Sequence, residues 1–225
     1  MNPDSDAGTG TLQGNVLLLT DDSLVHATLY EDGATVTADG ASGSPVKATW
    51  SAPDPFVLDG VARVATNWVS VKPDLVGGNA LLTYQAVQTT QVTNVDLALI
   101  SAATLDGIFT AVSTAPRSPS FGQVVLFFRS AGTGAALSGL HVEMASATGS
   151  VYASASGWVL DDGTASTNQS GLVVFGNVDP ANSSGTQQVV VTRVATTTTA
   201  AAPAGQFAVK VVQGAVTIAS VAVQL

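Results

Sequence analysis

The stretch "TNQSGLVVFGNVDP", residues 167–180, decides the fold. A polar turn leads to Gly171, and the side chains of Val173 and Phe175 then fall on the same side of an extended backbone. Pro180 lacks a backbone N–H and cannot continue an inner strand, so it ends the segment. The stretch therefore predicts a turn followed by a β-strand with a buried face.

Apolar and polar residues alternate in much of the remaining chain, in residues 34–38, 95–100, 140–144, 187–194 and 207–212. Val, Thr and Ile dominate these segments, and turn residues separate them at short intervals, as in β-sandwiches and barrels. The best helical candidate is 94–109, in which "ISAATL" predicts no more than one short turn. The sequence therefore predicts an all-β protein.

The composition restricts the class of partner. Only 10% of the 225 residues are charged, the formal net charge is −9 and the basic residues are scattered. A nucleic-acid partner is not expected, because phosphate binding needs clustered Lys and Arg. No apolar run approaches the roughly 20 residues of a membrane span, so none is predicted. A mean hydropathy of +0.36 with so few charges predicts a homo-oligomer or polymer that hides apolar surface.

Proline-rich "STAPRSPS" separates two runs of strand patterns. We expect a polar spacer at 1–12, a β-sandwich domain at 13–113, a linker at 114–120 and a second β-sandwich domain at 121–225. These would be two tandem antiparallel domains. A faint duplication supports them, since four residues recur in order about 110 positions later: Gly14, Gly33, Gly60 and Pro73 are matched by Gly122, Gly139, Gly171 and Pro180. Two unrelated β-domains are the alternative.

The second half carries a recognisable order of residues: Gly122, Gly139, Val142, Thr167, Gly171, Phe175, Val178 and Pro180. This order resembles the carboxypeptidase-regulatory-like, prealbumin-like (transthyretin-like) family of seven-stranded sandwiches, which includes the Cna-B modules of surface proteins. The resemblance implies an Ig-like or prealbumin-like sandwich for 121–225, and more weakly for the first half. It also implies a non-catalytic role as a stalk, an adhesive repeat or a module that contacts polysaccharide or protein.

Two departures from the family pattern stand out. Some Cna-B modules join a first-strand Lys to a last-strand Asn, but here the first strand of the second half carries Arg129 and no Lys, and residues 214–225 hold no Asn. That crosslink is therefore not expected. Residues 179–185, "DPANSSG", stand where Pro-Gly is usual, so this loop is the first place to look for a contact or a cation.

The sequence offers little catalytic chemistry. Its two histidines are His26, expected to be half-buried beside Leu24 and Tyr30, and His141, expected on a solvated face with Glu143. Neither belongs to a motif that pairs a nucleophile with a base, and no pair of histidines has metal-binding spacing. We therefore expect no enzyme, no catalytic residue and no cofactor.

Calcium is the metal that the side chains suit best, because it takes carboxylate and carbonyl oxygens. The weak candidates are Asp161, Asp162, Asp179 and Asn182, in two loops that lack EF-hand spacing. Many of the aspartates are instead expected to mark tight turns, because five precede glycine: Asp32, Asp39, Asp59, Asp106 and Asp162.

Exposed tryptophans could bind a cell-surface polysaccharide. Trp50, Trp68 and Trp158 lie near predicted strand ends, and Trp158 is the first to test because its neighbours are polar or glycine. Core filling is the competing role for each ring.

The opening "MNPDSDAGTG" shows no signal peptide and resembles the polar spacer after a processed export signal. The expected function is thus a non-enzymatic exported structural protein, a subunit of a cell-surface assembly, fibre or coat, located outside the cell or on its surface. The alternative is a polysaccharide- or protein-binding sandwich. The apolar C-terminal strand would pair within its own domain, or complete a neighbour's sheet.

Overall fold

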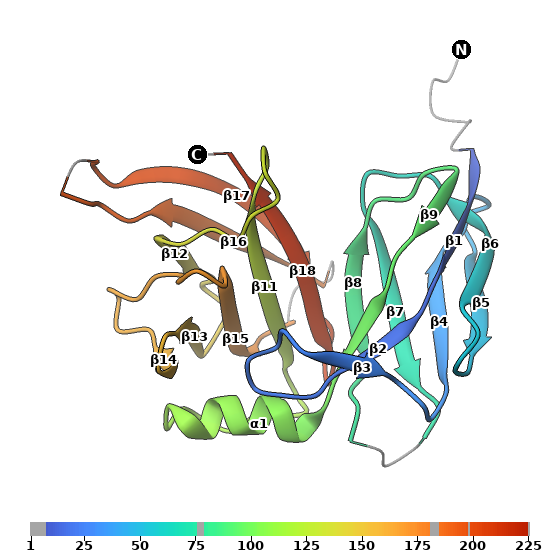
Figure 1. Cartoon of the computed structure of the whole chain (residues 1–225), viewed down its shortest axis with the longest axis horizontal. Helices are drawn as coiled ribbons and strands as arrows, with labels where there is room; N and C mark the ends of the chain where they lie inside the picture. Colours follow the sequence, from blue (N-terminus) through green and yellow to red (C-terminus); the bar gives the residue numbers. More distant parts are fainter. Residues whose placement is uncertain (1–7, 76–78, 181–184, 198, 225) are drawn as a thin grey trace. The chain divides into compact units, whose positions relative to one another are not determined.

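The structure is a computed structural model that describes residues 8–75, 79–180, 185–197 and 199–224. It confirms the all-β prediction, with 18 strands and one helix within these residues (Figure 1). The chain divides into two compact units, Met1–Thr104 and Leu105–Leu225. The predicted linker 114–120 lies within the second unit, so the predicted domain boundaries stay a prediction.

The first unit contains ten strands. They are β1 (Thr9–Gly14), β2 (Val16–Leu19), β3 (Ala27–Leu29), β4 (Ala34–Asp39), β5 (Pro45–Trp50), β6 (Phe56–Ala62), β7 (Asn67–Pro73), β8 (Thr83–Val87), β9 (Val92–Asn94) and β10 (Leu97–Ile100). Hydrogen bonding orders them as β8-β7-β4-β5, β6-β1-β9 and β10-β2-β3. Their inward side chains form one core that includes Leu12, Val36, Trp50 and Phe56.

The two three-stranded sheets of this unit are linked where β1 leads into β2 and β9 leads into β10. β1 runs parallel to β9, and β2 runs parallel to β10. At this link a Cβ on Gly14 would lie 1.8 Å from the Val95 carbonyl oxygen, so only glycine allows this approach. β1 begins at Thr9 and buries Leu12, so residues 9–12 of the predicted spacer lie in a strand.

The second unit contains the helix and eight strands. They are α1 (Ala102–Ala111, whose first residues belong to the first unit), β11 (Gly122–Ser130), β12 (Leu140–Glu143), β13 (Gly149–Ser154), β14 (Gly157–Leu160), β15 (Leu172–Val178), β16 (Thr186–Arg193), β17 (Ala202–Lys210) and β18 (Val216–Val223). Within this unit, hydrogen bonding orders the strands as β14-β13-β15-β11-β18 and β12-β16-β17. β15, the strand of the opening stretch, is buried at every residue.

The C-terminal strand pairs with a strand of its own unit. β18 pairs in parallel with β11 over eight residues, from Gln123↔Val216 to Ser130↔Val223. Of the two predicted arrangements, the pairing within the domain is therefore the one observed. Most other pairs in the unit are antiparallel, as expected.

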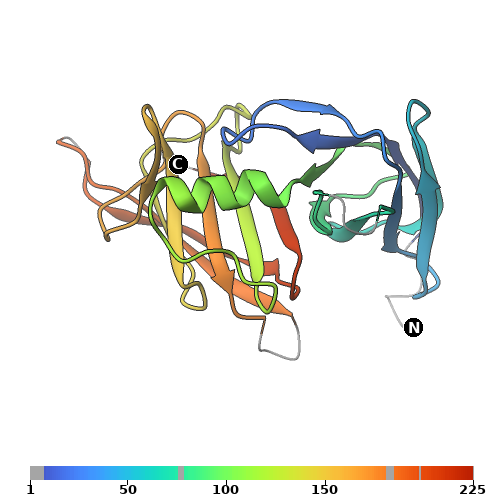
Figure 2. The ribbon, with the colours of Figure 1, turned by 90° about the horizontal axis from the view of Figure 1, so that it is seen from below.

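The helix α1 corrects the expectation of a single short turn. Ser101 caps it, because its hydroxyl oxygen accepts a hydrogen bond from the Thr104 backbone N–H at 2.9 Å. Leu105, Ile108 and Phe109 are buried at helical spacing. Figure 2 shows α1 crossing strands of the second unit, where Phe109 faces Gly176 of β15.

The outer edge of β12 is closed by side chains. The Tyr152 hydroxyl accepts a hydrogen bond from the Val142 N–H at 2.8 Å and donates to the Val142 carbonyl at 2.9 Å. Two residues earlier on the same edge, Thr167 uses its side chain and its backbone to bind both backbone polar groups of Leu140. At Leu140 and Val142, the backbone N–H and C=O groups of this edge are therefore already bonded and cannot pair with another strand.

Candidate functional site

The best candidate site is a groove in the second unit, called here the β12 groove, with a volume of about 460 Å³. It lies where the end of β12 passes the start of β13. Its lining combines buried apolar side chains with two carboxylates: Val142, Glu143, Met144, Ala145, Ala147, Gly149, Ser150, Asp161, Phe175, Gln188 and Val190. No Lys or Arg is among these residues.

The two carboxylates of the β12 groove differ in freedom. The side chain of Glu143 is 69% exposed, whereas that of Asp161 is 14% exposed. Both oxygens of Asp161 are engaged: Oδ2 accepts from the Ser150 hydroxyl at 3.0 Å, and Oδ1 accepts from the Gly163 N–H at 2.9 Å. The side chain of Asp161 is thus held in place by hydrogen bonds, while the exposed side chain of Glu143 can change its conformation when a ligand binds.

His141 stands beside both carboxylates. Its Nδ1 lies 2.9 Å from the Ala165 carbonyl oxygen and 4.0 Å from Asp161 Oδ1, and its Nε2 lies 3.3 Å from Glu143 Oε1. The ring stacks on Tyr152 with an interplanar angle of 12°. Because all three oxygens are acceptors, this arrangement favours a ring that donates from both nitrogens, which is the protonated form.

The balance of these contacts sets the charge of His141. Burial lowers its pKa, but the Ala165 carbonyl, Asp161 and Glu143 outweigh burial, so that the net pKa is raised above the ordinary value. Burial also raises the pKa of Tyr152, which keeps the hydroxyl protonated while it closes the β12 edge. The raised pKa favours a positive charge on His141, which lies beside both carboxylates of a groove whose lining contains no Lys or Arg.

The predicted calcium ligands do not form a common site among the described residues. Asp162 accepts from the Thr164 N–H and hydroxyl, and the bond from that hydroxyl lowers the pKa of its carboxyl. The Asp179 backbone binds Ser146 at one end of the β13 region, four residues from the Ser150 that holds Asp161. Asn182 lies outside the described residues. Within those residues, no three His, Cys, Asp or Glu side chains gather as a metal site, and calcium binding stays a prediction.

The aspartates that precede glycine lie in different kinds of local structure. Gly33, Gly60 and Gly163 adopt positive φ, of 81°, 81° and 88°. However, Gly60 forms a bulge inside β6, and Asp106 with Gly107 lies in α1, where the turn prediction is wrong. Asp106 instead pairs with Arg117 at 3.2 Å.

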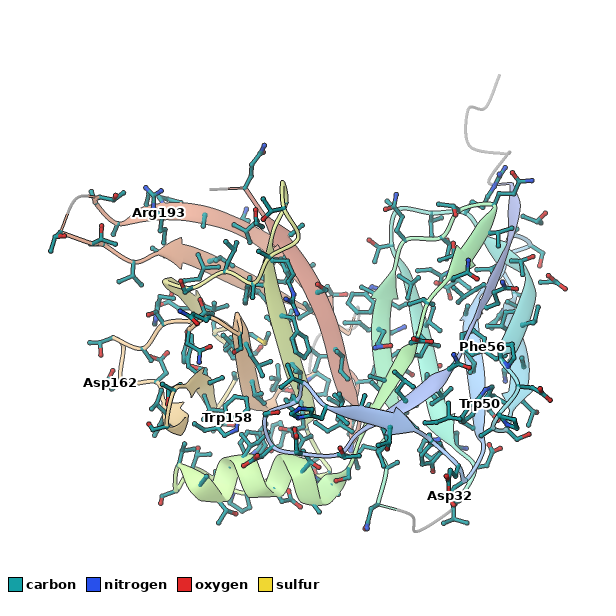
Figure 3. All side chains as sticks on the ribbon, in the orientation of Figure 1. Asp32, Trp50, Phe56, Trp158, Asp162 and Arg193 are labelled. Carbon is teal, nitrogen blue, oxygen red and sulfur yellow. The ribbon has the colours of Figure 1, made fainter. Side chains whose placement is uncertain are left out.

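The tryptophans fall into different environments, as Figure 3 shows for Trp50 and Trp158. Trp50 is 2% exposed and stacks on Tyr30, with ring centroids 6.5 Å apart, so it fills the core of the first unit. Trp68 and Trp158 are half-buried. Trp158 lies on β14 opposite Ala153, and a polysaccharide contact there stays a prediction.

The first histidine is placed differently from the expectation. The side chain of His26 is 77% exposed rather than half-buried, and it lies 2.5 Å from Asp21. Ser23 donates its hydroxyl to the same carboxylate at 2.6 Å instead of to the imidazole. His26 therefore does not activate Ser23 as a nucleophile.

No pattern in the sequence predicts the β12 groove. Met144 and Val190 match the pattern of ordinary strand residues, and the sequence marks Asp161 as a weak calcium candidate. They meet because β12 pairs with β16 while the loop after β14 returns to β13. The sequence predicts only that Glu143 and His141 lie on the same face of their strand.

Comparisons with known proteins give no family. No family model matches the sequence, and no curated protein matches it. The family resemblance therefore stays a prediction at the level of the family, while the β-sandwich arrangement is seen in the structure. No helix within the described residues is long and apolar enough to cross a membrane.

Solved structures with some likeness exist. The Bacillus anthracis TIE protein is 14% identical with a TM-score of 0.28, the match covering 96% of this chain and 34% of that one. The shaft pilin SpaA from Lactobacillus rhamnosus GG is 12% identical with a TM-score of 0.27, covering 94% and 97%. The major pilin subunit BcpA of Bacillus cereus is 10% identical with a TM-score of 0.28, covering 97% and 70%. We draw no activity or partner from these likenesses.

Proposed function

We propose that this chain is a non-enzymatic structural subunit of an extracellular or cell-surface assembly, such as a fibre or coat. The observation that carries the proposal is apolar surface on a protein with few charges. Large exposed apolar side chains occur in both units: Val25, Leu29, Val57, Val64, Leu75, Val92, Val159, Leu160 and Val190. Contact with other subunits would remove such surface from water.

The edge strands of the sheets differ in how well they are protected, and this difference favours one of them as the subunit contact. Proteins protect free strand edges with Pro, Lys or covering groups. β5 carries Pro45 and Lys47, β17 carries Pro203 and Lys210, and the β12 edge is closed by side chains. Neither Pro nor a charged residue occurs in β3, β9, β10 or β14, and of these edge strands β14 ("GWVL") alone carries two large exposed apolar side chains.

β14 is also exposed. Within the described residues it pairs only with β13, and its Val159 and Leu160 are 38% and 45% exposed. Edge pairing through β14 would bury both side chains and satisfy its backbone groups. We place the subunit contact at this strand.

The test is the oligomeric state of the full chain. Light scattering after size-exclusion chromatography is expected to show a mass that rises with concentration. Val159→Lys should reduce this association by placing charge on β14, whereas Thr49→Lys, at an exposed residue of the edge strand β5 that already carries Lys47, should leave it unchanged. A strict monomer at high concentration would show that the proposed function is wrong.

A further inference from the structure

We propose that the β12 groove binds the side chain of a lysine presented by a partner protein segment. The groove combines an apolar floor with two carboxylates and has no Lys or Arg in its lining. Its volume of about 460 Å³ lies within the range typical of ligand sites. This inference is independent of the proposed function, because a monomer could bind lysine equally well.

The apolar part of the groove fits a hydrocarbon stem. Val142, Met144 and Phe175 are each at most 6% exposed, so their lining faces form a rigid floor. Val190 lies at the open side and is 42% exposed. A lysine stem laid against Val190 and the exposed Ala145 would cover the apolar surface that the groove shows to water, while its ammonium stayed near the polar end.

The polar part fits an ammonium better than a guanidinium. An arginine binds strongly where one carboxylate offers both oxygens in a plane. Both oxygens of Asp161 already accept hydrogen bonds, and one oxygen of Glu143 faces His141. A compact ammonium needs only one lone pair from each of several acceptors. Asp161, Glu143, the Ser150 hydroxyl and the Gln188 amide oxygen are candidates for those positions.

The charge balance also favours a cation. Among the residues that the structure describes, His141 is the basic group paired with the two carboxylates, and when it is neutral they lack a positive partner there. Above the titration of His141 the groove therefore presents two negative charges. A lysine ammonium would supply the missing positive charge.

The test uses the full chain and two matched probes, N-acetyl-lysine methylamide and its uncharged analogue N-acetyl-norleucine methylamide. Titration is followed by NMR at about pH 8, which favours neutral imidazole. We expect the lysine probe to shift the amide signals of Met144, Ser150 and Val190. Glu143→Gln should weaken binding roughly three- to tenfold, whereas Glu31→Gln, at the only other glutamate of the chain, should not.

A second pair of variants leaves both carboxylates in place. Val190→Lys would put an internal ammonium at the groove and should compete with the probe, while Val159→Lys, outside the groove, should bind it as the wild type does. Val159→Lys also weakens the proposed assembly, so the two proposals can fail separately. Equal affinity for the norleucine probe, equal weakening by Glu31→Gln, or no shift at the groove would each overturn the inference.

Discussion

At the scale of single residues, backbone geometry explains why the opening stretch contains a glycine. Gly171 has φ of 68°, and a Cβ there would lie 2.4 Å from the Phe128 carbonyl oxygen. Two separate penalties therefore oppose any side chain: the positive φ and a contact with backbone that cannot rotate away.

Gly171→Ala should therefore lower the free energy of unfolding by about 3 kcal/mol or more, since it adds a steric clash to the cost of positive φ. Gly163→Ala is the matched control, because its φ is 88° but no atom lies within 4 Å of a Cβ there. Its cost should be about 1 kcal/mol. Urea unfolding of both variants measures the difference, and equal losses would show that the close contact is not decisive.

The contacts of His141 make stability depend on pH. Its pKa in the folded chain is raised, so protonation is favoured by folding. The stabilisation is fully present below the unfolded pKa of about 6.5 and is lost as pH rises through the folded pKa. Unfolding of the second unit should therefore become easier between mildly acidic and mildly alkaline pH.

NMR titration of the His141 ring tests the cause. Glu143→Gln removes one of the three groups that favour the charged ring, so the pKa of His141 should fall. Glu31→Gln should leave it where it is. An unchanged pKa in Glu143→Gln would show that the 3.3 Å contact carries no weight in solution.

At the scale of elements, Asn177 at the end of β15 fastens the segment before β11. Its amide oxygen accepts from the Ser118 N–H at 2.8 Å, and its amide nitrogen donates to the Pro116 carbonyl at 2.9 Å. The residue is only 8% exposed, and buried Gln123 binds it as well. The segment predicted as a linker is thus tied to the sandwich on both sides of Arg117.

Asn177→Gly should expose this segment to trypsin after Arg117. Glycine tolerates the positive φ of 49° at this position, so the substitution removes the amide with little backbone strain. Cleavage should become several-fold faster because local opening costs less free energy. Asn168→Gly is the control, and equal cleavage in both variants would argue against the role of Asn177.

The docking of α1 depends on the absence of a side chain at Gly176. A Cβ there would lie 3.2 Å from the Phe109 ring, closer than most packed atoms. Gly176→Leu should therefore cost about 2–3 kcal/mol by pushing the ring away from the sheet. In a Phe109→Ala chain the same change should cost less, and a double-mutant cycle from urea unfolding measures the coupling. Purely additive losses would contradict the contact.

At the scale of the whole molecule, the sequence predicts the strands well because alternation follows directly from burial. β4, β12 and β16 all lie where alternation was noted. The sequence predicts only a short turn within 94–109 because "AATLDGIFTA" is rich in small and β-branched residues and has no charge at either end. The predicted repeat is not uniform, since Gly60 lies within β6 whereas Gly171 precedes β15.

The groove could not be predicted for a related reason. Its residues come from four strands and two loops that meet only through sheet register. Local patterns show which face of a strand is buried. They do not show where strands from distant parts of the sequence end and leave a groove between them. The same limit applies to Asn177, whose partners precede it by about 60 residues.

The parallel pairing of β11 with β18 has a mechanical consequence. In the second unit the chain enters β11 at one end of this pair and leaves β18 at the other. Tension applied at Phe121 and Gln224 would slide the two strands along each other, loading the hydrogen bonds of eight residue pairs at once. Force spectroscopy through these two points should require a larger rupture force than pulling between Thr186 and Lys210, where β16 and β17 would unzip one bond at a time. Equal rupture forces would show that the second unit has no such shear clamp.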